Sequence, residues 1–209
     1  MTEASAMVYV VDDEPDMLKA LDRLLGAAGF SVQTFASPEQ FLAQHDDAAP
    51  GCIVLDLALP GLNGLELQQA LQAQGSALPI VFLTGRGDIA ASVRAMKLGA
   101  ADFLTKPVGA DVLIAAVDAA LERNRAQRAE RAEKHLLASR LAALTARERD
   151  VFELIAQGWL NKQIAAECGT VEQTIKFHRA NLMRKLGVRT VADLVRLAER
   201  AGTGKPHSD

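Results

Sequence analysis

Five side chains within the first 106 residues have the chemistry to handle a phosphoryl group. Asp12 and Asp13 follow an apolar stretch near the N-terminus, and Asp56, Thr84 and Lys106 each end or follow a later one. Adjacent carboxylates repel each other and resist ionising together unless a cation lies between them. Acidic residues are also common in the first turn of a helix, so the pair alone leaves a purely structural explanation open.

The elements that must position these residues alternate along the first 120 residues. Amphipathic helical segments separate five stretches with the composition of buried strands: 7–11, 31–35, 52–56, 79–83 and 101–105. Such alternation favours a parallel sheet covered on both faces, which binds ligands at the carboxyl ends of its strands. We therefore predict an α/β, doubly wound, five-stranded parallel sheet of the flavodoxin-like kind, with the five side chains at one edge.

Three carboxylates at that edge require a counter-charge. Mg²⁺ held by Asp12, Asp13 and Asp56 together with phosphate oxygens supplies it, because this ion prefers a few carboxylates plus phosphate ligands. Asp56 is then the candidate nucleophile, since a carboxylate can form an aspartyl-phosphate. Thr84 and Lys106 are expected to hold phosphoryl oxygens on the other side. The sequence predicts a phosphoacceptor site with Mg²⁺ as its cofactor.

Three segments carry a closer likeness: VVDDEPD, VLDLALPGLNGLEL and VFLTGRGDIAASVRAMKLGAADFLTKPV. Through them, residues 7 to about 122 resemble a response-regulator receiver domain. The resemblance implies a cis peptide bond between Lys106 and Pro107 and a backbone carbonyl of Ala58 as a further Mg²⁺ ligand. It also implies that Phe103 turns inward as Thr84 moves toward the phosphoryl group, which a sensor histidine kinase supplies.

Two positions depart from the common pattern of that family. Ala58 and Arg86 stand where receivers of this kind often have Arg and His, each two residues beyond a site residue. Both lie beside the path by which water reaches an acyl phosphate. We expect Arg86 to hold phosphoryl oxygens by charge-assisted hydrogen bonds and to lengthen the lifetime of the phosphorylated state.

Charge is distributed unevenly along the 209 residues. Residues 1–138 hold 11 Lys and Arg against 18 Asp and Glu, whereas residues 139–209 hold 12 against 8. This asymmetry predicts two domains with different partners, the basic one meeting nucleic acid. No apolar stretch approaches the roughly 18 residues of a membrane span, and the N-terminus lacks a signal-peptide pattern. We expect a cytoplasmic protein that does not associate with a membrane.

A charged segment separates the two parts. From Arg123 to Lys134 nearly every residue is charged or Ala, in a continuously helical pattern. Such a run is usually a solvated helix face, although a short coil paired between protomers stays open. We predict a receiver domain over 1–122, a helical linker over 123–140 and a second domain over 141–205.

The second domain shows only helical patterns. Thr145 with Glu148 predicts a capping box at the start of its first helix. A short helix over 161–168 and a basic helix over 171–186 are joined by a turn at Gly169, which is the layout of a helix-turn-helix. We predict an all-α, four-helix, helix-turn-helix domain, although a small basic bundle that binds protein would share this layout.

A second resemblance rests on residues spread over this domain: Leu144, Thr145, Glu148, Gly158, Asn161, Lys162, Ile164, Ala165, Thr174, Lys176, His178, Lys185, Leu186 and Gly187. They resemble a LuxR-type helix-turn-helix, and its pairing with a receiver resembles the FixJ/NarL-type response regulators. Val171 departs from the family at the usual cap position. Thr170 with Gln173 can form a capping box one residue earlier.

The resemblance implies that the helix over 171–186 lies in the major groove of double-stranded DNA. The residues expected closest to the bases are Lys176, Phe177 and Ala180. Those expected at phosphates, which position the protein without reading sequence, are Lys162, Thr174 and Arg179. His178 stays open between packing, a phosphate contact and a base contact.

These features predict a transcription regulator and not an enzyme. We expect a sensor histidine kinase to phosphorylate Asp56. The change then promotes homodimerisation, or releases the DNA-binding domain, or both, and leads to binding to promoter DNA, with RNA polymerase as a further candidate partner. The alternative is a phospho-independent regulator whose receiver serves as a dimerisation or partner-binding platform. A phosphatase of the aspartyl-phosphate type would need a second acid near its nucleophile, and the DLALP stretch offers none.

Overall fold

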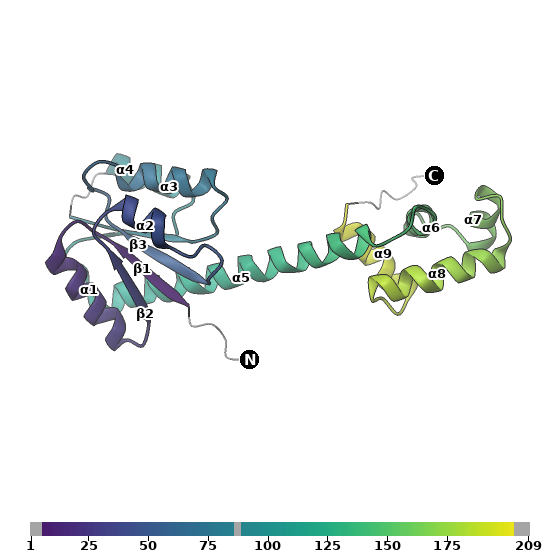
Figure 1. Ribbon diagram of the computed structural model, residues 1–209, viewed down its shortest axis with the longest axis horizontal. Helices are drawn as coiled ribbons and strands as arrows, with labels where there is room; N and C mark the ends of the chain where they lie inside the picture. Colours follow the sequence, from purple (N-terminus) through teal and green to yellow (C-terminus); the bar gives the residue numbers. More distant parts are fainter. Residues whose placement is uncertain (1–5, 86–88, 203–209) are drawn as a thin grey trace. The chain divides into compact units, whose positions relative to one another are not determined.

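The structure is a computed structural model that describes residues 6–85 and 89–202 (Figure 1). The residues pack into two units, which divide in the chain between Glu130 and Arg131. This division falls inside the segment 123–140 that we expect to link the domains. Within the described ranges, no helix is both long enough and apolar enough to cross a membrane.

The first unit is built on a five-stranded parallel sheet with strand order β2-β1-β3-β4-β5. Val11 pairs with Leu55, and Leu55 with Phe82, so the carboxyl ends of the three central strands lie in register at one edge. Each strand lies within one residue of its predicted bounds: β1 (Met7–Val11), β2 (Ser31–Phe35), β3 (Gly51–Leu55), β4 (Ile80–Thr84) and β5 (Asp102–Thr105).

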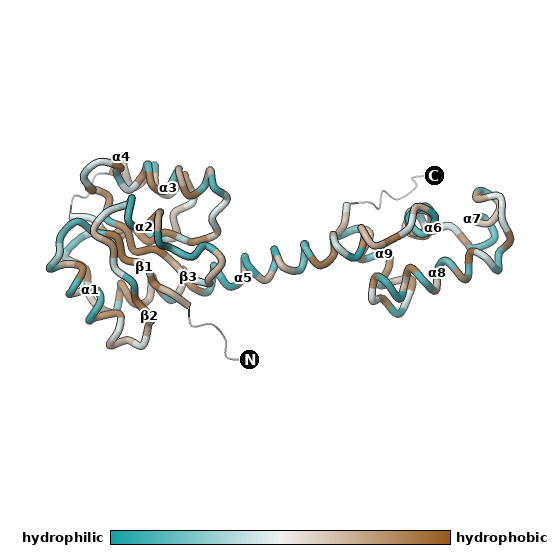
Figure 2. Tube along the Cα trace, viewed as in Figure 1, coloured by the Kyte–Doolittle hydropathy of each residue, from teal (hydrophilic) through white to brown (hydrophobic). Residues whose placement is uncertain are grey.

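Helices cover both faces of this sheet, as Figure 1 shows. One face carries α2 (Pro38–Gln44), α3 (Gly64–Ala73) and α4 (Ile89–Lys97), and the other carries α1 (Pro15–Ala27) and α5 (Ala110–Ala142). Side chains alternate between the faces along β1, β3 and β4, and those on both faces are mostly apolar. In Figure 2 the tube is brown, hence hydrophobic, along much of the sheet. A sheet buried on both faces therefore needs continuously apolar strands, which is the pattern that the sequence shows.

The helix α5 remains part of the first unit beyond residue 122. Asn124 is fully buried, accepts a hydrogen bond from the Gly51 amide at 3.1 Å and donates one to the Ala77 carbonyl at 2.7 Å. Arg128 donates to backbone carbonyls in the loop before β3 at 3.2 and 3.3 Å. Part of the run that we expected to be a solvated helix face is thus tied to the loops at the amino ends of the strands.

The second unit packs four helices, over residues 143–202, against the end of α5. They are α6 (Ala146–Ala156), α7 (Asn161–Glu167), α8 (Glu172–Leu186) and α9 (Val191–Arg200). Their shared core includes Phe152, Ile164, Leu182 and Leu194, all fully or almost fully buried. The predicted helical composition of this part of the chain is confirmed.

The helix starts agree with the sequence at α6 but not at α8. The Thr145 hydroxyl accepts from the Glu148 amide at 3.3 Å, and the Glu148 carboxylate accepts from the Thr145 amide at 2.8 Å, so the predicted capping box is present. A box between Thr170 and Gln173 is wrong. Val171 is the N-cap of α8 and has no side chain that can accept a hydrogen bond, which leaves Gln173 at the second helical position and not the third.

Candidate functional site

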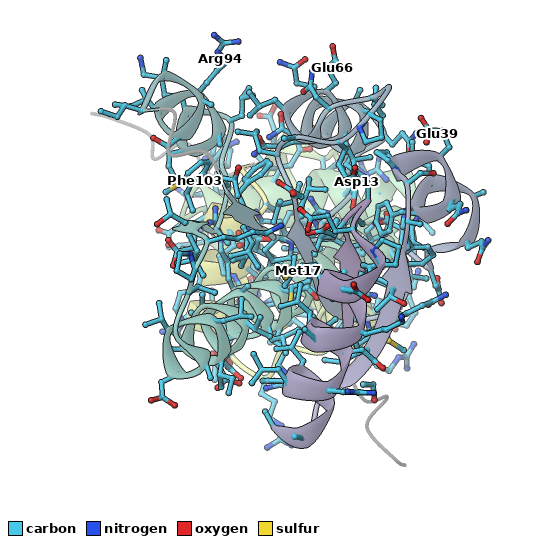
Figure 3. All side chains as sticks on the ribbon, turned by 90° about the vertical axis from the view of Figure 1, so that its left-hand side faces the viewer. Asp13, Met17, Glu39, Glu66, Arg94 and Phe103 are labelled. Carbon is cyan, nitrogen blue, oxygen red and sulfur yellow. The ribbon has the colours of Figure 1, made fainter. Side chains whose placement is uncertain are left out.

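The carboxyl ends of the strands bring the predicted phosphoacceptor residues together. Asp12 follows β1, Asp56 follows β3 and Thr84 ends β4; the first two are only 2% and 6% exposed, and Thr84 is fully buried. One oxygen from each of Asp12, Asp13 and Asp56 lies within 4.8 Å of the others. Figure 3 looks onto this end of the unit, where the exposed Asp13 lies between Phe103 and Glu39.

Lys106, which follows β5, joins the two buried carboxylates. Its Nζ donates to Asp12 Oδ2 at 2.6 Å and to Asp56 Oδ2 at 3.0 Å. Burial by itself lowers the pKa of Lys106, but the hydrogen bonds and charges of Asp12 and Asp56 outweigh it and raise the pKa above its ordinary value. Among the described residues, the Lys106 ammonium group thus compensates both carboxylates.

Backbone amides hold the other oxygen of each buried carboxylate. Asp12 Oδ1 accepts from the Glu14 amide at 2.9 Å, and Asp56 Oδ1 accepts from the Ala58 amide at 3.2 Å. These bonds fix both carboxylates with Oδ2 turned to Lys106, and they place the main chain of Ala58 beside Asp56. The chemistry of the donor set, three carboxylates within reach of one another, fits a hard divalent cation such as Mg²⁺.

The remaining receiver residues lie around this cluster. The peptide bond between Lys106 and Pro107 is cis, as the resemblance implied, and the Lys106 amide donates to the Thr84 carbonyl at 2.7 Å. Phe103 is half-buried on β5, with its ring centroid 6.0 Å from that of Phe82. Arg86 lies outside the described residues.

Gly64 is a site residue that the sequence analysis missed. It begins α3, and a Cβ built on it would lie 2.5 Å from the Asp56 carbonyl oxygen and 3.0 Å from Leu57 Cα. The Gly64 amide donates to the Leu57 carbonyl at 3.1 Å. The start of α3 therefore packs directly on the backbone of the candidate phosphoacceptor. Close approach of backbone is a common reason for glycine, but only the fold reveals what Gly64 approaches.

In the second unit, α8 presents one exposed face with helical spacing. Its members are Gln173, Lys176, Phe177, Ala180 and Arg184. Three of the residues that the sequence placed at DNA belong to this face, and a fourth, Lys162, is exposed on α7. Gln173 and Arg184 complete the face, and the spacing i, i+3, i+4, i+7 would have found them.

The other predicted DNA contacts are half-buried. Arg179 donates to the Asn161 side chain at 3.0 Å, a bond that ties α8 to α7, and Thr174 and His178 are also partly covered. Lys185, basic in the sequence motif, donates to Glu148 at 2.6 Å. The hydrogen bond from Lys185 has the largest effect on the buried Glu148 and lowers its pKa, and the hydrogen bond from the Thr145 amide lowers the pKa further. Lys185 thus has a structural partner inside the unit.

Comparisons with known families and proteins agree with both resemblances. Residues 8–118 match the response regulator receiver domain, and residues 142–198 match the LuxR family of bacterial regulatory proteins. The response regulator protein TodT of Pseudomonas putida is 39% identical over 200 residues, which cover 96% of this chain and 88% of TodT. The chain is a response regulator.

Two further relatives share both parts of this response regulator. The transcriptional regulatory protein FixJ of Bradyrhizobium diazoefficiens is 42% identical over 195 residues, which cover 93% of this chain and 95% of FixJ. The solved structure of response regulator StyR superposes with a TM-score of 0.89 at 44% identity, covering 94% of this chain and all of that one. The response regulator therefore belongs with transcriptional regulators that join a receiver to a LuxR-type DNA-binding domain.

Proposed function

We propose that the response regulator accepts a phosphoryl group on Asp56 from a sensor histidine kinase and thereby controls its binding to promoter DNA. The observation that supports this most strongly is the position of Asp56 within a cluster of three carboxylates, 3.0 Å from Lys106. The same edge of the sheet holds Thr84. Few arrangements other than phosphoryl transfer need an acid nucleophile, a cation site and an ammonium group together.

In the proposed reaction, a carboxylate oxygen of Asp56 forms a bond to the phosphorus of the kinase phosphohistidine. The bond between phosphorus and the imidazole nitrogen breaks, and the imidazole keeps the electron pair. Lys106 turns from Asp56 to a phosphoryl oxygen, and the buried Thr84 hydroxyl binds another. Asp12, Asp13, Asp56 and the Ala58 carbonyl would hold Mg²⁺, which would supply positive charge to the phosphoryl oxygens.

Phosphorylation is then coupled to self-association. Thr84 and Phe103 lie on adjacent strands, and their rearrangement changes the surface formed by β5 and α4. Exposed apolar side chains follow one face of α4: Ile89, Val93 and Met96. This face supports a homodimer on phosphorylation, because association removes it from water. Two DNA-binding units in one dimer raise the effective concentration of the second unit at a site with two halves.

For the second unit we propose contacts to promoter DNA through α8 and the start of α7. Lys176, Phe177 and Ala180 lie closest to the bases in this proposal, and His178 lies beside them. Lys162, Thr174 and Arg179 contact phosphates. RNA polymerase is a further candidate partner of the bound dimer. Phosphate contacts make the affinity fall steeply with salt, whereas base contacts distinguish one sequence from another.

Intact-protein mass spectrometry tests the phosphoacceptor. Incubation with acetyl phosphate and Mg²⁺ should add one phosphoryl group to the wild-type chain and none to Asp56→Asn. The matched control is Asp46→Asn, since Asp46 is exposed and its Oδ1, which accepts from the Ala48 amide, is kept in Asn. An adduct that persists in Asp56→Asn would exclude Asp56 as the nucleophile.

A DNA titration tests the coupling. Binding of the full chain to a selected duplex, with and without acetyl phosphate and Mg²⁺, should tighten with the phosphodonor in the wild type and in Asp46→Asn but not in Asp56→Asn. Light scattering on the same samples should show dimers only where binding tightens. The phospho-independent regulator would instead be supported if the wild-type protein were dimeric in all samples and its affinity for DNA did not change with the phosphodonor.

A further inference from the structure

Phe177 is an exposed aromatic residue on a helix face that is otherwise polar or small. Phe177 is 63% exposed, whereas the other six phenylalanines, which all lie in the described residues, are buried or half-buried. Its ring lies 6.0 Å from the His178 imidazole, tilted by 65°, so a neighbouring ring limits its orientation. A large apolar side chain in water gains free energy when a partner covers it.

The surroundings of Phe177 indicate what that partner is. Lys176 and Arg184 share its face, Lys162 is exposed on α7, and Ala180, one turn along α8, carries only a methyl group. An anionic partner can therefore approach the backbone of α8 closely at Phe177. The major groove of DNA admits a helix and is lined by phosphates, and the thymine C5-methyl is the apolar group that its base edges present.

We propose that Phe177 reads a thymine by packing its ring against the C5-methyl group. This inference rests on the proposed function, because it requires α8 to enter the major groove. Phe177 is better placed for this task than Lys176, whose ammonium group is paired with Glu172 at 3.2 Å and must exchange that partner before it can bind a base. The ring has no polar partner to give up.

The test removes the methyl group alone. Duplexes that bind the full chain, treated with acetyl phosphate and Mg²⁺, are selected from a random pool, and each thymine is then replaced singly by deoxyuridine. Base pairing and every hydrogen-bonding edge are kept. At one position in each half-site, deoxyuridine should weaken wild-type binding about 4-fold, the effect of leaving one methyl group uncovered.

Variants assign the effect to Phe177. Phe177→Ala should bind the thymine and deoxyuridine duplexes equally, and Phe177→Val should keep part of the preference. Leu136→Ala is the matched control, because Leu136 is an exposed apolar residue of the same unit that lies on α5, outside both α7 and α8; it should keep the full preference. Trp159 fluorescence, reporting a residue packed on the core of the second unit, checks that each variant is folded.

The outcomes separate this inference from the proposed function. Tight, salt-dependent DNA binding with no position sensitive to the methyl group would overturn the inference and leave the proposed function standing. Failure to bind any duplex would overturn both. Loss of dimers in Phe177→Ala, with the thymine preference unchanged, would show that the ring covers a protein surface and would also overturn the inference.

Discussion

Replacement of Lys106 by methionine tests the electrostatics of the receiver site most directly. The change keeps an apolar stem of similar length and removes the ammonium group that bonds to Asp12 and Asp56. Two carboxylates with oxygens within 4.8 Å of each other then lack compensation. At an effective dielectric constant of about 20, their repulsion at that distance is about 3 kcal/mol. Removal of one partner from a buried ion pair typically costs about 3–5 kcal/mol.

We therefore expect Lys106→Met to lower the free energy of unfolding of the receiver by about 3 kcal/mol in the absence of Mg²⁺. Mg²⁺ should restore most of this loss, because the ion no longer competes with an ammonium group for the same oxygens. Its apparent affinity for the variant should exceed that for the wild type. Phosphorylation by acetyl phosphate should nevertheless be slower, since Lys106 cannot hold the incoming phosphoryl group.

Thermal unfolding of the full chain, followed by circular dichroism with and without Mg²⁺, measures both effects. Trp159 is the single tryptophan and lies in the second unit, so its fluorescence identifies that transition and leaves the other to the receiver. The control is Lys19→Met, which breaks an exposed pair with Asp16 and should change stability by less than about 0.5 kcal/mol. Equal midpoints for Lys106→Met and wild type without Mg²⁺ would refute the reasoning.

Two further substitutions test the packing inside each unit. Glu148→Gln should destabilise the second unit by about 1 kcal/mol at pH 7, because its amide oxygen still accepts from Lys185 and Thr145 but lacks the negative charge that faces the Lys185 ammonium group. Folding lowers the pKa of Glu148. The stability difference between wild type and variant is therefore full above the ordinary pKa of about 4.3 and disappears as the pH falls through the lowered pKa. A difference in urea midpoint, followed by Trp159 fluorescence, that is the same at all pH values would contradict this prediction. Gly64→Ala should cost about 2 kcal/mol and slow phosphorylation of Asp56, because its Cβ meets backbone. The control is Gly26→Ala, where the added Cβ meets nothing within 4 Å, and it should be neutral or slightly stabilising. Equal stability changes for Gly64→Ala and Gly26→Ala in a urea titration would contradict the contact between a Cβ at residue 64 and the backbone.

The sequence predicted the sheet and the gathering of the site well, for a local reason. The central strands β1, β3 and β4 are covered on both faces and are apolar runs, which are visible in a window of five residues. A polar residue at the end of such a run must lie at the carboxyl edge, so Asp12, Asp56 and Lys106 could be brought together before any strand order was known. The parallel register brings the ends of these strands together, and the side chains then meet at 2.6 and 3.0 Å.

Contacts between distant parts of the chain could not be predicted from the sequence. Asn124 bonds to an amide 73 positions away, and Arg128 bonds to a carbonyl 81 positions away, although both lie in a charged run typical of solvated helices. In the same way, Thr174 and Arg179 are partly covered because α7 packs beside α8, and local composition does not reveal which basic residues a neighbouring helix covers. The helical period alone predicts which residues of α8 share its exposed face. How far the side chains beside that face are covered depends on the packing of neighbouring helices.

The resting arrangement of the receiver also bears on how the metal and the phosphoryl group depend on each other. Lys106 is shared between Asp12 and Asp56 and, among the described residues, is the one cation paired with Asp12, so in the proposed function a phosphoryl group on Asp56 draws this cation away. We therefore expect the carboxylates of Asp12 and Asp13 to bind Mg²⁺ more tightly once Asp56 is phosphorylated. By linkage, Mg²⁺ stabilises the phosphorylated state by the same free energy. In the proposed function, the acidic cluster therefore makes the signal depend on both ligands, because each supplies the charge that the other leaves uncompensated.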